Sequence, residues 1–327
     1  MKKIIGIGSA IVDIMTQLPD ENFLQKNNLQ KGGMFLVDET QIQTILNDSK
    51  NFEQKQTSGG SAANTIHGLA NLGTKVAYIG KVGEDKIGDF FVEDLKKSGI
   101  ETKLFYSKTS SAIASALITP DSERTFATYL GASVEMSPDD ITEELFEGYD
   151  ILHIEGYLVF NQALIEKALK TAKAKGLLIS IDMASFNVVE ANLDFLNEMV
   201  EKYVDIVFAN EEESKAFTQK EPKESCIEIG EKVDIAVVKI GKDGAYIKEK
   251  GKDIVLAPAF KANSIDTTGA GDSYAAGFLH GYINNASLYN ASKIGALIAA
   301  NIIEQVGAKM PKEKWETIKP QIDELLK

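Results

Sequence analysis

Short apolar runs alternate with longer amphipathic segments along most of the chain. The apolar runs are mostly β-branched, which is typical of strands buried on both faces of a sheet. They are Ile4–Gly8, Val76–Gly80, Ile151–Ile154, Leu177–Asp182, Ile206–Ala209 and Ile235–Ile240. The segments between them predict helices near Ala62–Leu72, Gly88–Ser98, Asn161–Lys175 and Asn210–Phe217. Because strand and helix alternate, we expect an α/β fold, with helices on both sides of a mainly parallel sheet.

Two regions interrupt this alternation, at residues 11–38 and 103–130. Both carry β-prone or apolar stretches separated by polar residues, such as Ala112–Thr119 and Thr125–Leu130. We expect them to form a small discontinuous β lid, while residues 1–10, 39–102 and 131–327 form the α/β core. The last part of the core predicts three successive helices, at Ala270–Ile283, Leu288–Glu304 and Lys312–Leu326.

The composition is that of an ordinary globular protein. The chain has 327 residues, of which 44% are apolar and 25% charged, and a formal net charge of −13. The acidic balance disfavours nucleic acid as a partner but allows a small anionic ligand held by local positive potential. Cys226 is the only cysteine, so no intrachain disulfide can form, and no apolar run is long enough for a membrane helix or a signal peptide. We therefore expect a cytoplasmic protein with no membrane partner.

The basic residues are distributed unusually, because 34 of the 35 are lysines and Arg124 is the only arginine. One explanation is a composition bias in which lysine fills every ordinary surface role. The other is a single site that requires the planar, forked guanidinium group, which lysine cannot replace. Composition alone leaves both explanations open.

Several common catalytic motifs are absent or incomplete in the sequence. Gly6–Ile11 begins like a dinucleotide fingerprint, but Ile11 stands where a small residue is needed for helix–strand packing. Gly68–Lys75 resembles a P-loop, but its last two residues are reversed and it ends a predicted helix, so Gly73 is better explained as a C-terminal glycine. The sequence has no His or Cys cluster with metal-ligand spacing and no G-x-S-x-G motif.

The most informative segment is Asp266-Thr267-Thr268-Gly269-Ala270-Gly271-Asp272-Ser273, which opens a predicted helix. Small residues let the backbone approach a ligand closely, and free amides at a helix start favour an anion such as a phosphoryl group. Asp272 is placed there to accept a proton from an attacking hydroxyl. The alternative is a glycine turn whose first-turn Asp stabilises the helix dipole.

A second segment, Ser58-Gly59-Gly60-Ser61-Ala62-Ala63-Asn64, also precedes and opens a predicted helix. It can present amides and the Asn64 side chain to hydroxyl groups. The alternative is an ordinary Ser/Gly helix cap.

Taken together, Gly59–Asn64, Gly80-Lys81-Val82-Gly83-Glu84-Asp85 and Asp266–Asp272 resemble the ribokinase-like (PfkB) sugar and nucleoside kinase family over nearly the whole chain. The resemblance implies a three-layer α/β/α domain with a mainly parallel central sheet and a small discontinuous β lid. It also implies ATP-dependent phosphorylation of a hydroxyl group, with Mg²⁺ accompanying ATP. A requirement for K⁺ or another monovalent cation stays open, as do a monomer and a lid-mediated homodimer.

The resemblance also implies roles for individual residues. The catalytic group comprises Asp272, the amides of Gly269, Ala270 and Gly271, and Arg124, which would reach the phosphates when the lid closes. The acceptor would be bound by Asp13, Gly59, Gly60, Ser61 and Asn64. ATP would be bound by Asn210, Lys239, Gly241, Gly244 and Asn301. Glu213 would organise Mg²⁺ through water. Asp182 ends a predicted strand at the expected ligand crevice, without an assigned role.

The segments around Val12-Asp13-Ile14 and Arg124–Ala132 are most similar to adenosine-kinase-type members. A nucleoside base needs a flat apolar slot, and Phe35, Leu36 and Phe126 are candidate walls, although they could equally be lid core. We therefore expect a nucleoside kinase, most readily one that converts adenosine to AMP. The alternatives are a kinase acting on ribose, fructose or a related sugar, and a catalytically silent sugar- or nucleoside-binding regulator.

Overall fold

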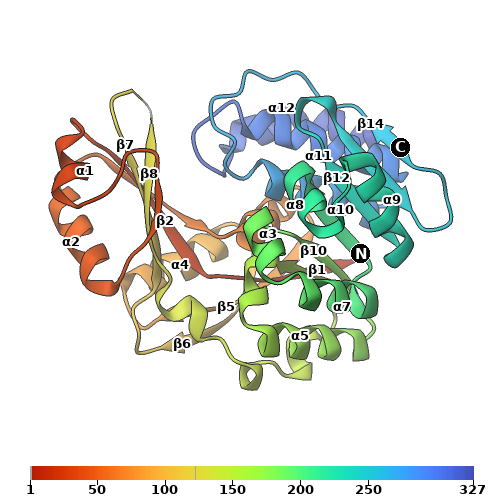
Figure 1. The fold of residues 1–327 in the computed structure, drawn as a ribbon, viewed down its shortest axis with the longest axis horizontal. Coiled ribbons are helices and arrows are strands. Elements are labelled where there is room, and N and C mark those ends of the chain that lie inside the picture. Colours follow the sequence, from red (N-terminus) through yellow and green to blue (C-terminus); the bar gives the residue numbers. More distant parts are fainter. Residues whose placement is uncertain (1, 122) are drawn as a thin grey trace.

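The computed structural model describes residues 2–121 and 123–327, which form a large α/β/α unit and a smaller unit beside it (Figure 1). The large unit is built on a nine-stranded sheet with the order β14-β13-β12-β11-β10-β9-β1-β5-β6. The strands from β12 to β6 are parallel, and β13 and β14 add an antiparallel edge. Their bounds are β1 (Lys3–Ile7), β5 (Lys75–Gly83), β6 (Glu101–Ser107), β9 (Ile151–Glu155), β10 (Leu178–Asp182), β11 (Ile206–Asn210), β12 (Ile235–Lys239), β13 (Ala245–Glu249) and β14 (Val255–Ala257).

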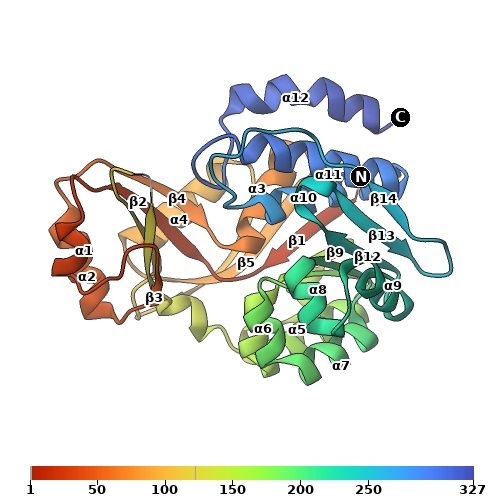
Figure 2. The ribbon, with the colours of Figure 1, turned by 45° about the horizontal axis from the view of Figure 1, so that its top comes forward.

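Helices cover both faces of this sheet (Figure 2). One layer contains α5 (Gln162–Ala174), α6 (Phe186–Ala191), α7 (Leu193–Tyr203), α8 (Glu211–Thr218) and α9 (Pro222–Lys232). The other contains α3 (Ser61–Asn71), α4 (Lys86–Lys97), α10 (Ala270–Ile283), α11 (Leu288–Ile302) and, outside α11, α12 (Lys312–Leu325). Neighbouring residues such as Ile4 and Ile5 are both fully buried but belong to different core clusters, because successive side chains of a strand point to opposite faces. This explains why the strands are continuous apolar runs.

The smaller unit is a five-stranded sheet with the order β3-β8-β7-β2-β4. Its strands are β2 (Ile11–Gln17), β3 (Met34–Leu36), β4 (Gln54–Gly59), β7 (Ala112–Ile118) and β8 (Arg124–Tyr129). Two helices, α1 (Asn22–Lys26) and α2 (Glu39–Ser49), lie at the outer end of the molecule and pack with this sheet (Figure 1). We call the five strands with α1 and α2 the lid.

The lid has different boundaries from those expected. Residues 39–59, expected in the core, form α2 and β4, and both belong to the lid. Residues 103–107, expected in the lid, continue β6 of the large sheet. Strand β4 was missed because it is a polar edge strand, Gln54-Lys55-Gln56-Thr57-Ser58-Gly59, with its first three residues exposed.

The predicted core elements agree closely with the observed ones. All six predicted strands, the four helices between them and the three tail helices lie within a few residues of their observed bounds. Short 3₁₀ helices occupy Gly131–Glu135, Pro138–Asp140, Glu143–Phe146, Gly156–Phe160 and Gly241–Asp243. Among the described residues, no helix is both long and apolar enough to cross a membrane.

Candidate active site

A cavity of about 1830 Å³ lies between the lid and the carboxyl ends of the parallel strands. Those strand ends supply Glu155 from β9, Asp182 from β10, Asn210 from β11 and Lys239 from β12. A crevice at this edge is where open α/β sheets bind ligands. Pockets for one small ligand usually have volumes of about 300–1,000 Å³, so this cavity has room for two.

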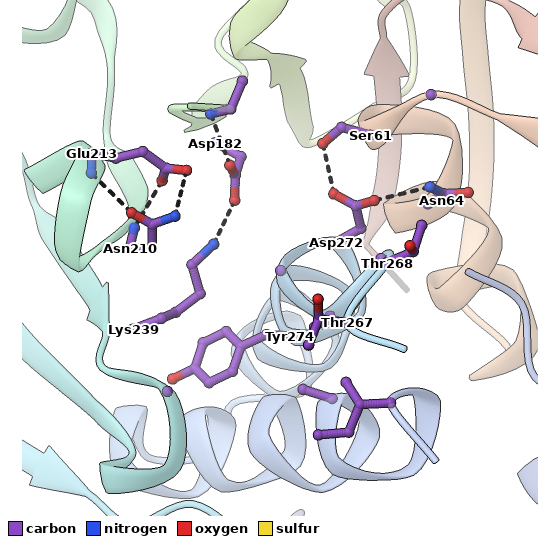
Figure 3. Close-up of a pocket in the computed structure, with 18 of the residues that line it drawn as sticks. Ser61, Asn64, Asp182, Asn210, Glu213, Lys239, Thr267, Thr268, Asp272 and Tyr274 are labelled. Carbon is purple, nitrogen blue, oxygen red and sulfur yellow. Dashed lines mark hydrogen bonds and ion pairs between the residues drawn. The ribbon is translucent and has the colours of Figure 1, made fainter. Parts of the chain in front are cut away.

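The segment before α10 forms one side of the cavity (Figure 3). Gly269 has a φ of +74°, and a Cβ on it would lie 2.6 Å from Ala308 Cβ, so only glycine fits. The helix begins at the next residue, Ala270. The amides at this helix start therefore border the cavity, where they favour an anion.

Asp272, in the first turn of α10, is held by two donors from α3 (Figure 3). Ser61 Oγ donates to Oδ1 at 2.6 Å, and Asn64 Nδ2 donates to Oδ2 at 2.9 Å. Burial raises the pKa of Asp272 to about 7, and nearby Asp182 adds to that rise. Asn64 Oδ1 is buried without a hydrogen-bond partner among the described residues, so it can accept from a bound molecule. The two motifs recognised in the sequence thus meet at one carboxylate.

A buried charge cluster lies opposite Asp272 (Figure 3). Lys239 Nζ donates to Asp182 Oδ2 at 2.8 Å and lies 3.1 Å from the position that a Cβ on Gly271 would take. Burial alone would lower the pKa of Lys239, but Asp182 and Glu213 raise it above its ordinary value. Lys239 therefore stays charged beside the helix start. Its positive charge can bind phosphate there.

Glu213 is 3% exposed and forms a reciprocal cap with Asn210 at the start of α8. Asn210 donates to both carboxylate oxygens at 2.8 Å, from its backbone N and from Nδ2, and Asn210 Oδ1 accepts from Glu213 N. Burial and the charge of Asp182 raise the pKa of Glu213 to about 7. Both residues border the cavity.

The carboxylates of the cavity offer oxygen ligands of the kind that Mg²⁺ prefers. In the described ranges, no three His, Cys, Asp or Glu residues converge closely enough to hold a metal by themselves. Mg²⁺ rarely uses such a cage, because it keeps several waters and combines one or two carboxylates with substrate phosphates. Asp182, Glu213 and Asp272 face one ammonium group, that of Lys239, and burial and mutual repulsion raise the pKa of Glu213 and Asp272. Their hard oxygen atoms and excess negative charge fit a hydrated Mg²⁺ accompanied by phosphates.

The acceptor-binding candidates lie at the lid end of the cavity. Asp13, Gly60, Ser61 and Asn64 line it, whereas Gly59 does not. Gly59 instead makes room for Asp13, since a Cβ on it would lie 2.3 Å from Asp13 Oδ2. Burial raises the pKa of Asp13 to about 7.

The nucleotide-side candidates lie at the other end of the cavity, with one exception. Asn210, Lys239, Gly241 and Gly244 line it. Asn301 does not: its amide donates to Leu297 O at 2.8 Å, within α11. The residues of α11 that face the cavity are Ala296, Ala299 and Ala300. The helix on which the sequence placed Asn301 therefore borders the cavity, but through these alanines and not through Asn301.

Arg124 also differs from its expected place. It lies at the start of β8, and its Nη1 pairs with Asp266 Oδ1 at 2.6 Å and contacts Thr268 Oγ1 at 3.3 Å. It is absent from the cavity lining. The guanidinium therefore joins the lid to the segment before α10, and in this conformation it binds a carboxylate where we expected a phosphate contact.

The sequence interpretation missed one buried carboxylate and assigned no role to another. Glu155 accepts from the backbone N of Ala62 at 3.2 Å and of Ser9 at 3.4 Å, and burial raises its pKa. It thus joins the start of α3 to the link between β1 and β2. Its signal was a charged residue at the end of an apolar strand. Asp182 carried the same signal, which indicated the crevice but not the pairing with Lys239.

The chain is similar to several known kinases. The pfkB family carbohydrate kinase profile matches residues 33–315. A 5-dehydro-2-deoxygluconokinase of Clostridium perfringens is 30% identical over 302 residues, covering 86% of this chain and 87% of that protein. A probable sugar kinase of Rhizobium etli has a TM-score of 0.86 at 31% identity, with 98% of both chains covered. An adenosine kinase of Sinorhizobium meliloti has a TM-score of 0.84 at 32% identity, covering 98% of this chain and 99% of the other. These similarities show a ribokinase-like α/β fold, and the chain belongs to the pfkB family of carbohydrate kinases.

Proposed function

We propose that this ATP-dependent pfkB-family phosphotransferase phosphorylates the primary 5′-hydroxyl of a ribonucleoside, with adenosine as the preferred acceptor. The observation that carries the proposal is the lid wall of the cavity. Met34 and Leu36, which are 79% and 77% exposed, line the cavity, as do Phe35 and Phe126. A bare sugar leaves such an apolar wall in water, whereas a nucleoside base covers it.

The other end of the acceptor region suits a ribose. Asp13 has two carboxylate oxygens that can accept from both hydroxyls of the ribose diol. Asn64 Oδ1, which has no partner among the described residues, can accept a further hydroxyl proton. The apolar wall and the polar end belong to the same cavity, so a nucleoside can place its base against the wall and its ribose at the polar end.

Asp272 is the proposed general base. As the 5′-oxygen of the nucleoside attacks the γ-phosphorus of ATP, the proton of that hydroxyl passes to the Asp272 carboxylate. The bond between the γ-phosphorus and the oxygen that bridges it to the β-phosphate breaks, and ADP leaves. A pKa of about 7 suits this role, because a general base works best when its pKa is near the operating pH. Ser61 and Asn64 hold the carboxylate in place.

The transferring phosphoryl group would lie at the start of α10. The amides of Gly269, Ala270 and Gly271 and the ammonium of Lys239 would stabilise its charge. Glu213 would hold waters of Mg²⁺, and the ion would supply neutralisation of the phosphate charge. Arg124 would support this region through Asp266, or move onto a phosphate when the lid closes.

A sugar kinase is the second candidate, because the Clostridium perfringens relative is named for a sugar-acid substrate and the Rhizobium etli structure is described as a probable sugar kinase. ADP release separates the candidates when it is measured with adenosine, other nucleosides, ribose, fructose, fructose phosphates and 5-dehydro-2-deoxygluconate in turn. We expect the highest kcat/KM with adenosine. A higher value with any sugar would contradict the proposal, and ligand binding without ADP release from any acceptor would indicate a regulator.

A further inference from the structure

A short segment beyond the end of α11 connects the start of α10 with the lid end of the proposed active site. It consists of Gly307, Ala308 and Lys309. We call them the connector segment. Gly307 N donates to Asp266 Oδ2 at 2.6 Å, and Ala308 packs against Gly269 at the start of α10. The next residue, Lys309, reaches the lid sheet. Lys309 takes no part in the proposed catalysis at the start of α10, so that role does not explain why its side chain is held at the lid.

Lys309 is held in a defined position although its side chain is only 15% exposed. Its Nζ donates to Asp94 Oδ2 at 2.7 Å and to Ser58 Oγ at 2.5 Å. Asp94 Oδ2 also accepts from Ser58 N at 3.1 Å and from Ser58 Oγ at 2.6 Å. These bonds fix the ammonium group beside β4, one residue before Gly59. The Lys309 ammonium, the Asp94 carboxylate and the Ser58 hydroxyl thus hydrogen-bond to one another. A shift of Lys309 would leave Asp94 and Ser58 without this partner in a partly buried site, which costs free energy.

Asp13 lies next to this group. Val12 is opposite Ser58 in the strand pairing, and the Asp13 carboxylate is packed directly on Gly59. Within residues 2–121 and 123–327, no protein group donates a hydrogen bond to that carboxylate. Burial raises its pKa, Lys309 lowers it, and Asp272 raises it further. Lys309 is thus the positive charge that offsets the burial of Asp13.

We propose that Lys309 is a positioning residue of the acceptor site, whose ammonium group, fixed by Asp94 and Ser58 behind Gly59, holds the Asp13 carboxylate in its charged form for the acceptor hydroxyls. The inference rests on the proposed function, in which Asp13 binds those hydroxyls. An ionised carboxylate can only accept, so it can take protons from two hydroxyls at once, whereas a protonated one loses part of that capacity.

The effect of pH follows from the charges that surround Asp13. They are Lys309 after α11, Asp272 on α10 and, behind Lys309, Asp94 on α4 with His67 on α3. Asp13 must be ionised to bind, so acceptor affinity falls as the pH falls through its pKa of about 7. Removing the Lys309 charge raises that pKa. The acid limb of kcat/KM for the acceptor therefore moves to higher pH.

The first test is Lys309→Met, with the KM for the acceptor and the KM for ATP measured across pH. If the Asp13 pKa rises by about one unit from about 7, its ionised fraction at pH 7 falls about fivefold. We therefore expect a KM for the acceptor about fivefold higher at pH 7, a nearly unchanged KM for ATP, and a difference that shrinks toward pH 9. Lys309→Arg keeps the charge and should keep the wild-type acid limb.

Lys173→Met is the matched control. Lys173 on α5 also forms a partly buried pair with an aspartate, at 2.6 and 2.7 Å to the two oxygens of Asp205, in the opposite helical layer. It should lower thermal stability without moving the acid limb. If Lys309→Met behaves like Lys173→Met, the inference is wrong. If Lys309→Met does not fold, Lys309→Gln is subjected to the same comparison, because its amide can still donate to Asp94.

Asp13→Asn separates this inference from the proposed function. If Asp13→Asn leaves the KM for the acceptor unchanged, the acceptor site itself is wrongly placed. If it raises that KM, Lys309→Met added to Asp13→Asn should cause no further rise, because the carboxylate through which Lys309 acts is gone. A further rise of about fivefold in the double variant would overturn the inference while leaving the proposed function intact.

Discussion

At the scale of single residues, the site depends on how a few buried charges are paired. Lys239 is bonded to Asp182, while Asp272 and Glu213 are held by amide and hydroxyl donors and have raised pKa values. Burial disfavours the charged form of a carboxylate, and the charge of Asp182 adds to this. Asp272 can therefore take up a proton near neutral pH, which an exposed aspartate does poorly.

Asp272→Asn tests this property directly. The amide keeps the shape and can still contact Ser61, but it cannot accept the hydroxyl proton. We expect kcat to fall about 10²–10⁴-fold, with acceptor binding retained. ADP release gives the rate, and calorimetric titration with adenosine gives the affinity. The exposed Asp194 on α7 provides the control, Asp194→Asn, which should leave both unchanged. A turnover near the wild-type rate in Asp272→Asn would exclude Asp272 as the base.

At the scale of elements, the start of α10 depends on a backbone that only glycine adopts readily. Gly269 combines a φ of +74° with close packing against Ala308. The same turn carries Thr268, whose backbone N and Oγ1 donate to Asp266 Oδ1 at 3.0 and 2.7 Å. The helix start is thus fixed both by its own turn and by the connector segment.

Gly269→Ala should disturb this helix start. The positive φ and the contact with Ala308 together should lower the free energy of unfolding by about 1–3 kcal/mol and lower kcat as well. Gly251→Ala is a matched control, because Gly251 has a φ of +75° but no atom within 4 Å of the position that a Cβ would take. Urea unfolding and ADP release measure the two effects. Equal losses of stability and rate in both variants would show that backbone strain alone matters.

At the scale of the whole molecule, residues of both the lid and the core line the cavity. The apolar lid wall closes one side of the cavity, and Arg124 joins the lid to Asp266. Closure of such a lid excludes water and limits ATP hydrolysis. Changes in the lid wall and in this ion pair should therefore affect the reaction although neither contains the proposed base.

Leu36→Ala should weaken binding of the nucleoside but not of ATP. Leu36 is 77% exposed, so its truncation has little effect on the core, while it removes part of the proposed wall for the base. We expect the KM for adenosine to rise severalfold, with the KM for ATP unchanged. The control is Leu256→Ala, since Leu256 on β14 is 50% exposed but lies outside the cavity lining. An unchanged KM for adenosine in Leu36→Ala would remove the base from this wall.

Arg124→Lys should lower kcat although the charge is kept. Arg124 Nη1 makes both contacts, to Asp266 and to Thr268, so the other guanidinium nitrogens can bind a phosphate when the lid closes, which the single ammonium of lysine cannot do at the same time. Steady-state kinetics with saturating ATP and adenosine measure the effect. Wild-type kinetics in this variant would leave composition bias as the explanation for the single arginine.

The parts of the fold and of the site that could be predicted from the sequence are those with a local sequence pattern. The buried strands are continuous apolar runs, and the helix starts at Gly60 and Gly269 carry recognisable motifs. The missed parts have weak local signals. Strand β4 is polar because it lies at an edge of its sheet. The sequence could not show whether Asn301 or Ala300 borders the cavity, because the side of α11 that faces the cavity depends on how the helix packs against its neighbours.

The sequence by itself determined the α/β class, most of the core elements, the family and the two glycine motifs that open α3 and α10. These follow from apolar periodicity and from short runs of residues, both of which are local properties. Only the tertiary structure decided the partners: Lys239 with Asp182, Arg124 with Asp266, and Lys309 with Asp94 and Ser58. The partners in these pairs are separated by 57 to 251 positions in the chain, and nothing in a local pattern says which charges folding will bury together.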